Sequence, residues 1–195
     1  MGHLLRPQKV LLYHYVDEFL ARPKRYHTAL DLGCGDMQFA PKVPASRYIG
    51  VDVNAERLAK AAARYPQAVA IASSIEDVDV SVKGDLVLCL QCIGMNNLFK
   101  AERGVSVVRK IVAATEPCGD LVFNAELDAE KMKEIDRLAR DAFSRVRHIR
   151  YGRFSKERAP GAAHLLARLM RFIPPLAISG SRRVGLYLCE ARKPA

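Results

Sequence analysis

A short apolar strand that runs directly into two glycines limits this chain to a small number of folds. Residues 29–36 read Ala-Leu-Asp-Leu-Gly-Cys-Gly-Asp. Gly33 and Gly35 lack Cβ atoms, so the chain can turn tightly there and a polar ligand can lie against the backbone. Asp31 places a carboxylate at the end of the strand, where it can meet a cationic ammonium group.

A second acidic residue follows the glycines at the spacing of a nucleotide-binding unit. Residues 48–54 read Tyr-Ile-Gly-Val-Asp-Val-Asn, a second apolar strand that ends in Asp52. A βαβ unit uses an acid about 20 residues beyond its glycines to bind a ribose diol. The two acids and the turn predict a pocket for a nucleoside that also bears an amino group. The structural alternative is that Asp31 caps the turn and Asp52 caps the next helix.

The segment Asp31–Gly35 resembles the first motif of class I S-adenosylmethionine (SAM)-dependent methyltransferases, and the likeness extends from about Ala29 to Glu190. NAD and flavin domains also use a Gly-x-Gly turn, but Gln38 stands where their fingerprint has a third glycine. The resemblance implies a seven-stranded, mostly parallel, Rossmann-like doubly wound α/β sheet whose last strand is antiparallel. It also implies SAM as the methyl donor and S-adenosylhomocysteine (SAH) as the product.

The resemblance assigns cofactor-binding roles residue by residue. Ser74 stands where the family commonly has an acid for the adenine amino group, so its hydroxyl would substitute. The implied set is Asp31, Gly33, Cys34 and Gly35 for the methionine part, Asp52 for the ribose, Val53, Ser74 and Ile75 for the adenine, and Leu90 and Gln91 for the methionine or ribose.

Methyl transfer needs a general base only if the acceptor must lose a proton. The candidate bases are His14 beside Tyr13, His148, His164 and Glu126, and each histidine could equally be a packing or surface residue. Many related small-molecule enzymes have a histidine near position 95, where this chain has Met95. Residues 90–95 also lack the Asn/Asp-Pro-Pro-aromatic motif of enzymes that methylate amino groups of DNA and RNA.

Neither a metal nor a disulfide is expected. Cys89 and Cys92 have the spacing of a redox or zinc pair, but no second pair or nearby histidine completes a site. The five cysteines are an odd number and lie largely in apolar runs, which favours reduced thiols in a cytoplasmic protein.

The net charge of +10 is unevenly distributed. Residues 145–193 contain twelve Lys or Arg and two Glu, which accounts for the whole excess. Such a region attracts anions. Together with the family resemblance, this charge predicts O-methylation of a small or saccharide-like, anionic acceptor. The alternatives are an RNA-modifying methyltransferase and a catalytically inactive SAM-fold scaffold.

The chain is expected to form one domain, residues 1–195, with an N-terminal helical cap (1–26) and a basic helical insertion before the last strand (152–181). The insertion carries Arg168 and Arg171 and is a candidate substrate wall, membrane-surface contact or core helix. No secretory signal or transmembrane run is expected. The oligomeric state is left open. The predicted strands are 27–32, 47–53, 68–72, 85–90, 120–124, 145–151 and 183–190, and the predicted helices are 9–21, 54–64, 103–115 and 128–143.

Overall fold

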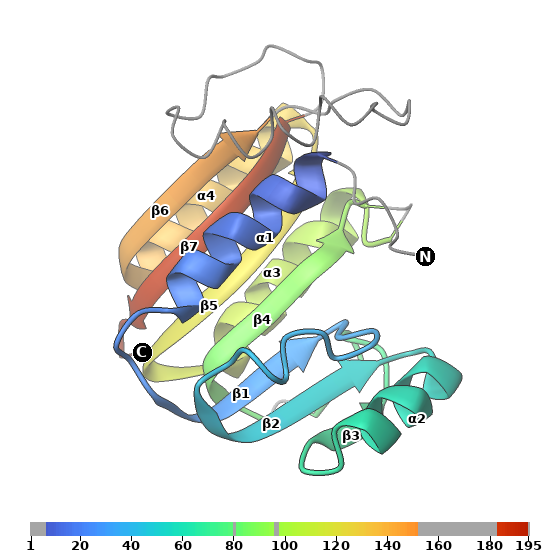
Figure 1. Cartoon of the computed structure of the whole chain (residues 1–195). Coiled ribbons are helices and arrows are strands. Elements are labelled where there is room, and N and C mark those ends of the chain that lie inside the picture. Colours follow the sequence, from blue (N-terminus) through green and yellow to red (C-terminus); the bar gives the residue numbers. More distant parts are fainter. Residues whose placement is uncertain (1–6, 80, 96–97, 152–182, 195) are drawn as a thin grey trace.

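The computed structural model describes residues 7–79, 81–95, 98–151 and 183–194. These residues form a seven-stranded sheet with helices on both faces (Figure 1). The predicted insertion, with His164, Arg168 and Arg171, lies outside the described residues. The elements are α1 (Pro7–Leu20), β1 (Tyr26–Leu32), β2 (Ala45–Asp52), α2 (Ala55–Arg64), β3 (Val69–Ala72), β4 (Gly84–Ile93), α3 (Ala101–Ala114), β5 (Thr115–Leu127), α4 (Ala129–Ala142), β6 (Phe143–Tyr151) and β7 (Arg183–Arg192).

The strand order is β3-β2-β1-β4-β5-β7-β6. Strands β1 to β5 pair in parallel, whereas β7 runs antiparallel to both β5 and β6. The predicted fold class is therefore confirmed, including the antiparallel last strand. Because the parallel strands all point the same way, their carboxyl ends meet at one edge of the sheet, where open α/β sheets bind ligands.

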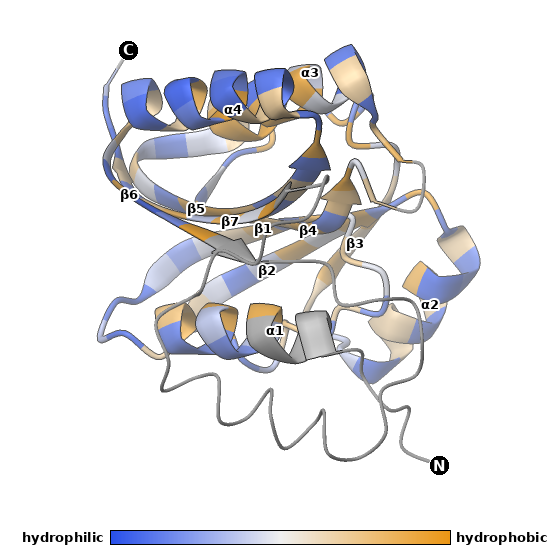
Figure 2. Cartoon of the chain, turned by 90° about the horizontal axis from the view of Figure 1, so that it is seen from above, coloured by the Kyte–Doolittle hydropathy of each residue, from blue (hydrophilic) through white to orange (hydrophobic). Residues whose placement is uncertain are grey.

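Two apolar layers lie on the two faces of the sheet (Figure 2). One layer packs under α3 and α4, and the other packs under α1 and α2. Helix α1 contributes an apolar stripe at helical spacing, with Leu12, Val16 and Phe19 all at most 5% exposed. Burial of such large side chains supplies about 1.5–3 kcal/mol each. The sheet is thus covered on both sides, as its continuous apolar strands predict.

The segment between β1 and β2 does not form the crossover helix that a βαβ unit usually has at this point. Residues 33–44 form successive turns and contain no helical turn long enough to be assigned as a helix. The N–H of Met37 donates to the carbonyl of Cys34, and the N–H of Val43 donates to that of Phe39. Pro41 and Pro44 account for this, since proline lacks an N–H and disfavours helix in the residue before it.

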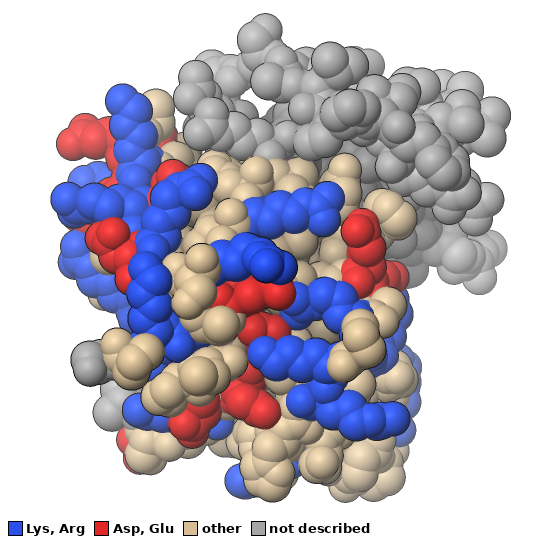
Figure 3. All heavy atoms as spheres, turned by 90° about the vertical axis from the view of Figure 1, so that its left-hand side faces the viewer, with Lys and Arg blue, Asp and Glu red and all other residues tan. Residues whose placement is uncertain are grey.

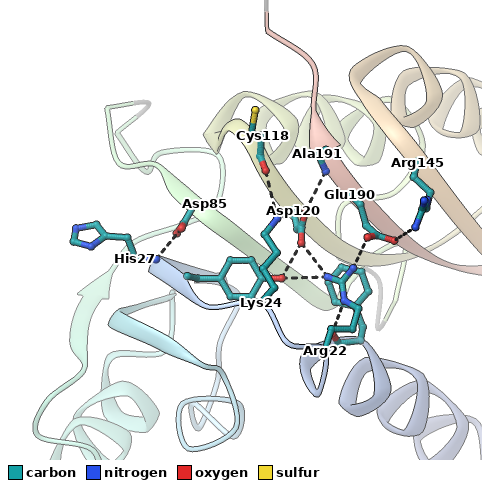
Figure 4. Close-up of polar contacts among 11 residues, drawn as sticks. Arg22, Lys24, His27, Asp85, Cys118, Asp120, Arg145, Glu190 and Ala191 are labelled. Carbon is teal, nitrogen blue, oxygen red and sulfur yellow. Dashed lines mark hydrogen bonds and ion pairs between the residues drawn. The ribbon is translucent and has the colours of Figure 1, made fainter.

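The edge of the sheet opposite the carboxyl ends is held by a buried carboxylate (Figure 4). Asp120 is completely buried and accepts hydrogen bonds from the Tyr26 hydroxyl (2.8 Å) and the Ala191 N–H (3.1 Å). Arg22 and Lys24 each place a side-chain nitrogen 2.9 Å from its oxygens. Asp120 therefore joins β1, β5, β7 and the segment after α1 at one point.

Candidate functional site

The glycine turn follows β1 at the carboxyl edge of the sheet. Its path is fixed by two backbone bonds, from the N–H groups of Gly33 (2.8 Å) and Cys34 (3.0 Å) to the carbonyl of Val51. Gly33 has φ +78° and Gly35 has φ +52°. Both values lie in the left-handed region that glycine adopts without strain. The conformation of the turn therefore favours glycine at these positions.

The protein's own packing imposes a second requirement on these glycines. A Cβ on Gly33 would overlap the sulfur of Cys92, and a Cβ on Gly35 would lie 2.8 Å from Nη2 of Arg57. Arg57 lies in the first turn of α2 and makes a two-point ion pair with Asp36 (3.0 and 3.1 Å). The Arg57–Asp36 pair thus fastens α2 to the turn.

Asp52 connects the turn to the start of α2. Its Oδ2 accepts the N–H of Gly35 at 2.8 Å, and its Oδ1 accepts the N–H of Asn54 at 2.8 Å. Asp52 is not the cap of α2. That role is filled by Asn54, whose side chain accepts the N–H of Arg57. Each carboxylate oxygen accepts two hydrogen bonds, so both Asp52 oxygens retain capacity for a further donor.

Asp31 lies deeper than the other candidate residues and is only 2% exposed. Its carboxylate accepts a hydrogen bond from the hydroxyl of Tyr48 on β2. Burial raises the pKa of Asp31 to about 7; the Tyr48 bond opposes this shift, and the nearby charge of Asp52 adds to it. Asp31 is therefore poised to change its charge near neutral pH, according to what approaches it.

The remaining predicted cofactor residues gather around the same edge. Val53 is 71% exposed, an unusual position for a branched apolar side chain. Ile75 is buried, and its Cδ1 lies within van der Waals distance of the position a Gly33 Cβ would take. Ser74 is half-buried, and its hydroxyl accepts the N–H of Glu76 at 3.2 Å. Leu90 is buried in the layer under α1, and the Cys34 thiol is buried with a raised pKa.

Gln91 has an uncommon backbone conformation for a residue with a side chain. Its φ is +63°, a left-handed value that costs about 1–2 kcal/mol in a non-glycine residue. Its N–H donates to Oδ1 of Asn124 on β5 at 2.7 Å. The carboxyl end of β4, next to the glycine turn, is therefore held in a strained shape by a side chain.

The structure separates the candidate general bases. His148 lies on β6, four strand positions from β1 and thus roughly 20 Å away at ordinary strand spacing. Its Nδ1 lies 3.1 Å from Asp136, and its ring stacks on Tyr187 with centroids 4.2 Å apart. Glu126, expected just after the fifth strand, lies within β5 and is 7% exposed.

His14 is half-buried on α1, and its ring contacts that of Tyr15. Its neighbour Tyr13 accepts a hydrogen bond from Gln38 at 3.0 Å and packs edge-on against Phe39. Helix α1 is thereby attached to the segment that follows the glycines. His14 is thus the neighbour of a residue that contacts this segment, whereas His148 lies on β6.

Three residues that contact this site are not predicted from the sequence. Tyr48 could have been found from strand alternation, because a parallel register that pairs residue 31 with residue 50 places Tyr48 and Asp31 on the same face. Asn124 is a polar residue within the apolar run 121–125, which signals a special role. Arg57 gave no such signal.

Two kinds of site are absent from the part of the chain that the structure describes. It contains no group of three or more His, Cys, Asp or Glu that could hold a metal ion. None of its helices has the length and hydropathy needed to span a bilayer.

On the face in Figure 3, acidic and basic side chains are interleaved. Ion pairs such as Arg140–Asp136 (2.8 Å) and Arg147–Glu18 (3.6 Å) illustrate this mixing.

Solved structures of methyltransferases share this fold. The chain is similar to the N-methyltransferase NodS from Bradyrhizobium japonicum WM9, with a TM-score of 0.62, 15% identity, and coverage of 97% of each chain. It is similar to the plantazolicin methyltransferase BamL in complex with a triazolic desmethylPZN analog and SAH, with a TM-score of 0.61, 13% identity, and coverage of 94% of this chain and 86% of that one.

A third similar structure is an rRNA methylase from Streptococcus thermophilus, with a TM-score of 0.54, 14% identity, and coverage of 97% of this chain and 99% of that one. No family model matches the sequence, and no curated protein is similar to it at a significant level. At these identities the likeness establishes the fold, which is that of the class I methyltransferases.

Proposed function

We propose that this chain, which has the fold of the class I methyltransferases, is a SAM-dependent methyltransferase. The observation that carries the proposal is the position of Asp52 at the carboxyl edge of the sheet. Its carboxylate is oriented by the N–H groups of Gly35 and Asn54, and both oxygens can still accept a hydroxyl of a ribose diol. Similar structures that contain SAH support the same cofactor here.

The residues around Asp52 fit the rest of a SAM molecule. Val53 offers an exposed apolar surface to an adenine ring, and the Ser74 hydroxyl lies beyond β3, the neighbouring strand of β2. Gly33 is half-exposed and presents backbone to the methionine part. Asp31 supplies the negative charge that an ammonium group requires.

When bound, SAM supplies a methyl group on a sulfonium sulfur, a leaving group that needs no acid. The chain's own tasks are then to align the acceptor and to exclude water. The Gly33–Gly35 turn, the Arg57–Asp36 pair and α1 form the fixed surroundings of that reaction.

The acceptor that we propose is a small or saccharide-like molecule with an anionic oxygen as nucleophile. An oxygen that is already ionised needs no general base. This fits a site in which His148 is engaged with Asp136 and Tyr187 several strands away. NodS is an N-methyltransferase, so nitrogen is the competing nucleophile. Mass spectrometry of products formed from paired carboxylate and amine acceptors would distinguish the two.

Replacement of Asp52 by alanine is expected to weaken SAH binding by about 1.5–3 kcal/mol, or roughly 10- to 150-fold, because a charge-assisted two-point contact is lost. Isothermal titration calorimetry with SAH measures the change. Glu56→Ala is the matched control, since it removes an exposed carboxylate from the first turn of α2 and should leave SAH affinity unchanged. Equal affinities for wild type and Asp52→Ala would refute the ribose assignment. Failure of the wild type to bind SAH would favour the inactive scaffold and refute both enzymatic functions.

The second candidate function is modification of RNA, favoured by the net charge of +10 and by the similarity to an rRNA methylase. Neutralisation of phosphates by six to ten basic groups lowers affinity by about 10³–10⁵ between 50 and 200 mM salt. We expect no such dependence for binding of a mixed-sequence RNA hairpin, measured by fluorescence anisotropy. A steep decline with salt would favour the RNA-modifying function instead.

A further inference from the structure

We propose that Asn124 is a positioning residue that fixes Gln91 in the pose in which its side chain contacts the bound nucleoside. The inference rests on the proposed function. It concerns the end of β4, where the strand leaves its regular pairing with β5.

Strand β4 contains a bulge at this point. Cys89 pairs with Phe123 and Ile93 pairs with Ala125, so β4 advances four residues while β5 advances two. Alternation is broken accordingly, because the consecutive residues Cys92 and Ile93 both belong to the apolar layer under α3 and α4. A bulge of this kind redirects a side chain.

Asn124 lies on β5 between the two residues that flank the bulge, and it is completely buried. Its Oδ1 accepts the N–H of Gln91 at 2.7 Å, in place of the backbone carbonyl that a regular strand would use. Its Nδ2 lies 3.4 Å from the sulfur of Met95. An amide buried in a sheet is unfavourable unless it is hydrogen-bonded, so both contacts restrict its orientation.

The identity of residue 91 indicates that the pose has a use beyond closing the bulge. Glycine would adopt the φ of +63° without strain, yet the chain has glutamine there. Gln91 is half-buried at the carboxyl edge, and the next residue, Cys92, contacts the glycine turn at Gly33. Strain held in place by surrounding structure is concentrated at ligand sites. Residue 91 is therefore next to the turn, where a glutamine amide can reach a ligand that the turn binds.

The variant Gln91→Gly distinguishes the effect of the Gln91 side chain from that of its backbone conformation. It keeps the left-handed conformation, so the thermal midpoint should be equal or higher, while SAH affinity should fall about tenfold with the loss of one polar contact. Asn124→Leu removes the acceptor and should lower SAH affinity by the same factor. In the double variant no further loss is expected, because Asn124 acts through a side chain that is already absent.

Thr115→Val is the matched control. Thr115 is also a completely buried polar residue of β5, and its hydroxyl donates to the carbonyl of Ile111 at 2.9 Å, far from the carboxyl edge. This variant should lower the thermal midpoint and leave SAH affinity unchanged. If Asn124→Leu does not fold, Asn124→Ala takes its place in the cycle. Calorimetric titration with SAH and thermal unfolding are measured on every variant.

The outcomes separate this inference from the function on which it rests. Wild-type affinity in Gln91→Gly, or losses in the two single variants that multiply to about a hundredfold in the double, would overturn the positioning role while leaving SAH binding intact. A wild-type protein that does not bind SAH would overturn the proposed function, and the role of Asn124 with it.

Discussion

Replacement of Asp120 by alanine is expected to lower the free energy of unfolding by about 3 kcal/mol, because removal of one partner from a buried ionic cluster leaves the others without their acceptor. Tyr26 and the Ala191 N–H lose their bonds at a completely buried position. Arg22 and Lys24 are 26% and 40% exposed, so water compensates them in part. In a chain of this size the midpoint of thermal unfolding should fall by roughly 6–12 °C.

Glu190 provides the matched control for that experiment. It also pairs with Arg22, but it is 31% exposed. Glu190→Gln should therefore change the free energy of unfolding by less than about 1 kcal/mol, as exposed pairs do. If both variants unfold at the same temperature as the wild type, the cluster does not hold this edge of the sheet.

The affinity for SAH is expected to rise about tenfold per pH unit between pH 5 and 7 and then to level off. The pKa of Asp31 is about 7 in the free protein because of burial, so the carboxyl is mostly protonated at pH 5. If its carboxylate pairs with the ligand's ammonium group, binding must release that proton, and linkage makes the affinity pH-dependent below the pKa. Titration calorimetry in buffers of different ionisation enthalpy measures both the affinity and the proton released.

Two variants test the assignment to Asp31. Asp31→Asn cannot ionise, so its SAH affinity should be weak and independent of pH between 5 and 7. Tyr48→Phe removes a hydrogen bond that lowers the pKa of Asp31, so the rise in affinity should move to higher pH. A pH-independent wild type would show that Asp31 does not meet the ammonium group.

The same pKa affects stability, and the sign is opposite to that of a paired surface acid. The folded-state pKa of Asp31 is raised from 3.8 to about 7, so the folded protein binds more protons than the unfolded chain in this interval. The contribution of Asp31 to stability is therefore present below pH 3.8 and is lost as the pH rises to 7, by at most about 4 kcal/mol. Asp31→Asn should remove this dependence from unfolding measurements.

The sequence predicts those elements whose signal is local. The apolar run 85–90 and the helix predicted over 54–64 both appear in the structure, as β4 and α2, since burial and helix capping depend on neighbouring residues. The predicted strand 120–124 is the central part of β5, which extends at both ends, from Thr115 to Leu127. The residues at its amino end are not predicted because Cys118 has a positive φ and the register shifts there.

Parts of the candidate site depend on the arrangement of distant strands and could not be predicted. The spacing of Asp31 and Asp52 identifies them as candidate ligand-binding residues. Their roles in cofactor binding stay predictions. The contact of Tyr48 with Asp31 follows from the register of β1 and β2. The contact of Asn124 with Gln91 depends on the irregular register of β4 and β5, which the sequence does not reveal. The stacked rings of Phe123, Tyr187 and His148 likewise require three strands to be adjacent.

The insertion of β7 between β5 and β6 has a consequence for folding during synthesis. Strands β1 to β5 precede β6 and β7 in the chain, and their parallel pairings involve neither of those two strands. Strand β6 then emerges before its partner in the sheet, because β7 follows it in the chain. We therefore expect a nascent chain to expose the open edge of β5 until β7 has emerged, which gives chaperones a period in which to bind it.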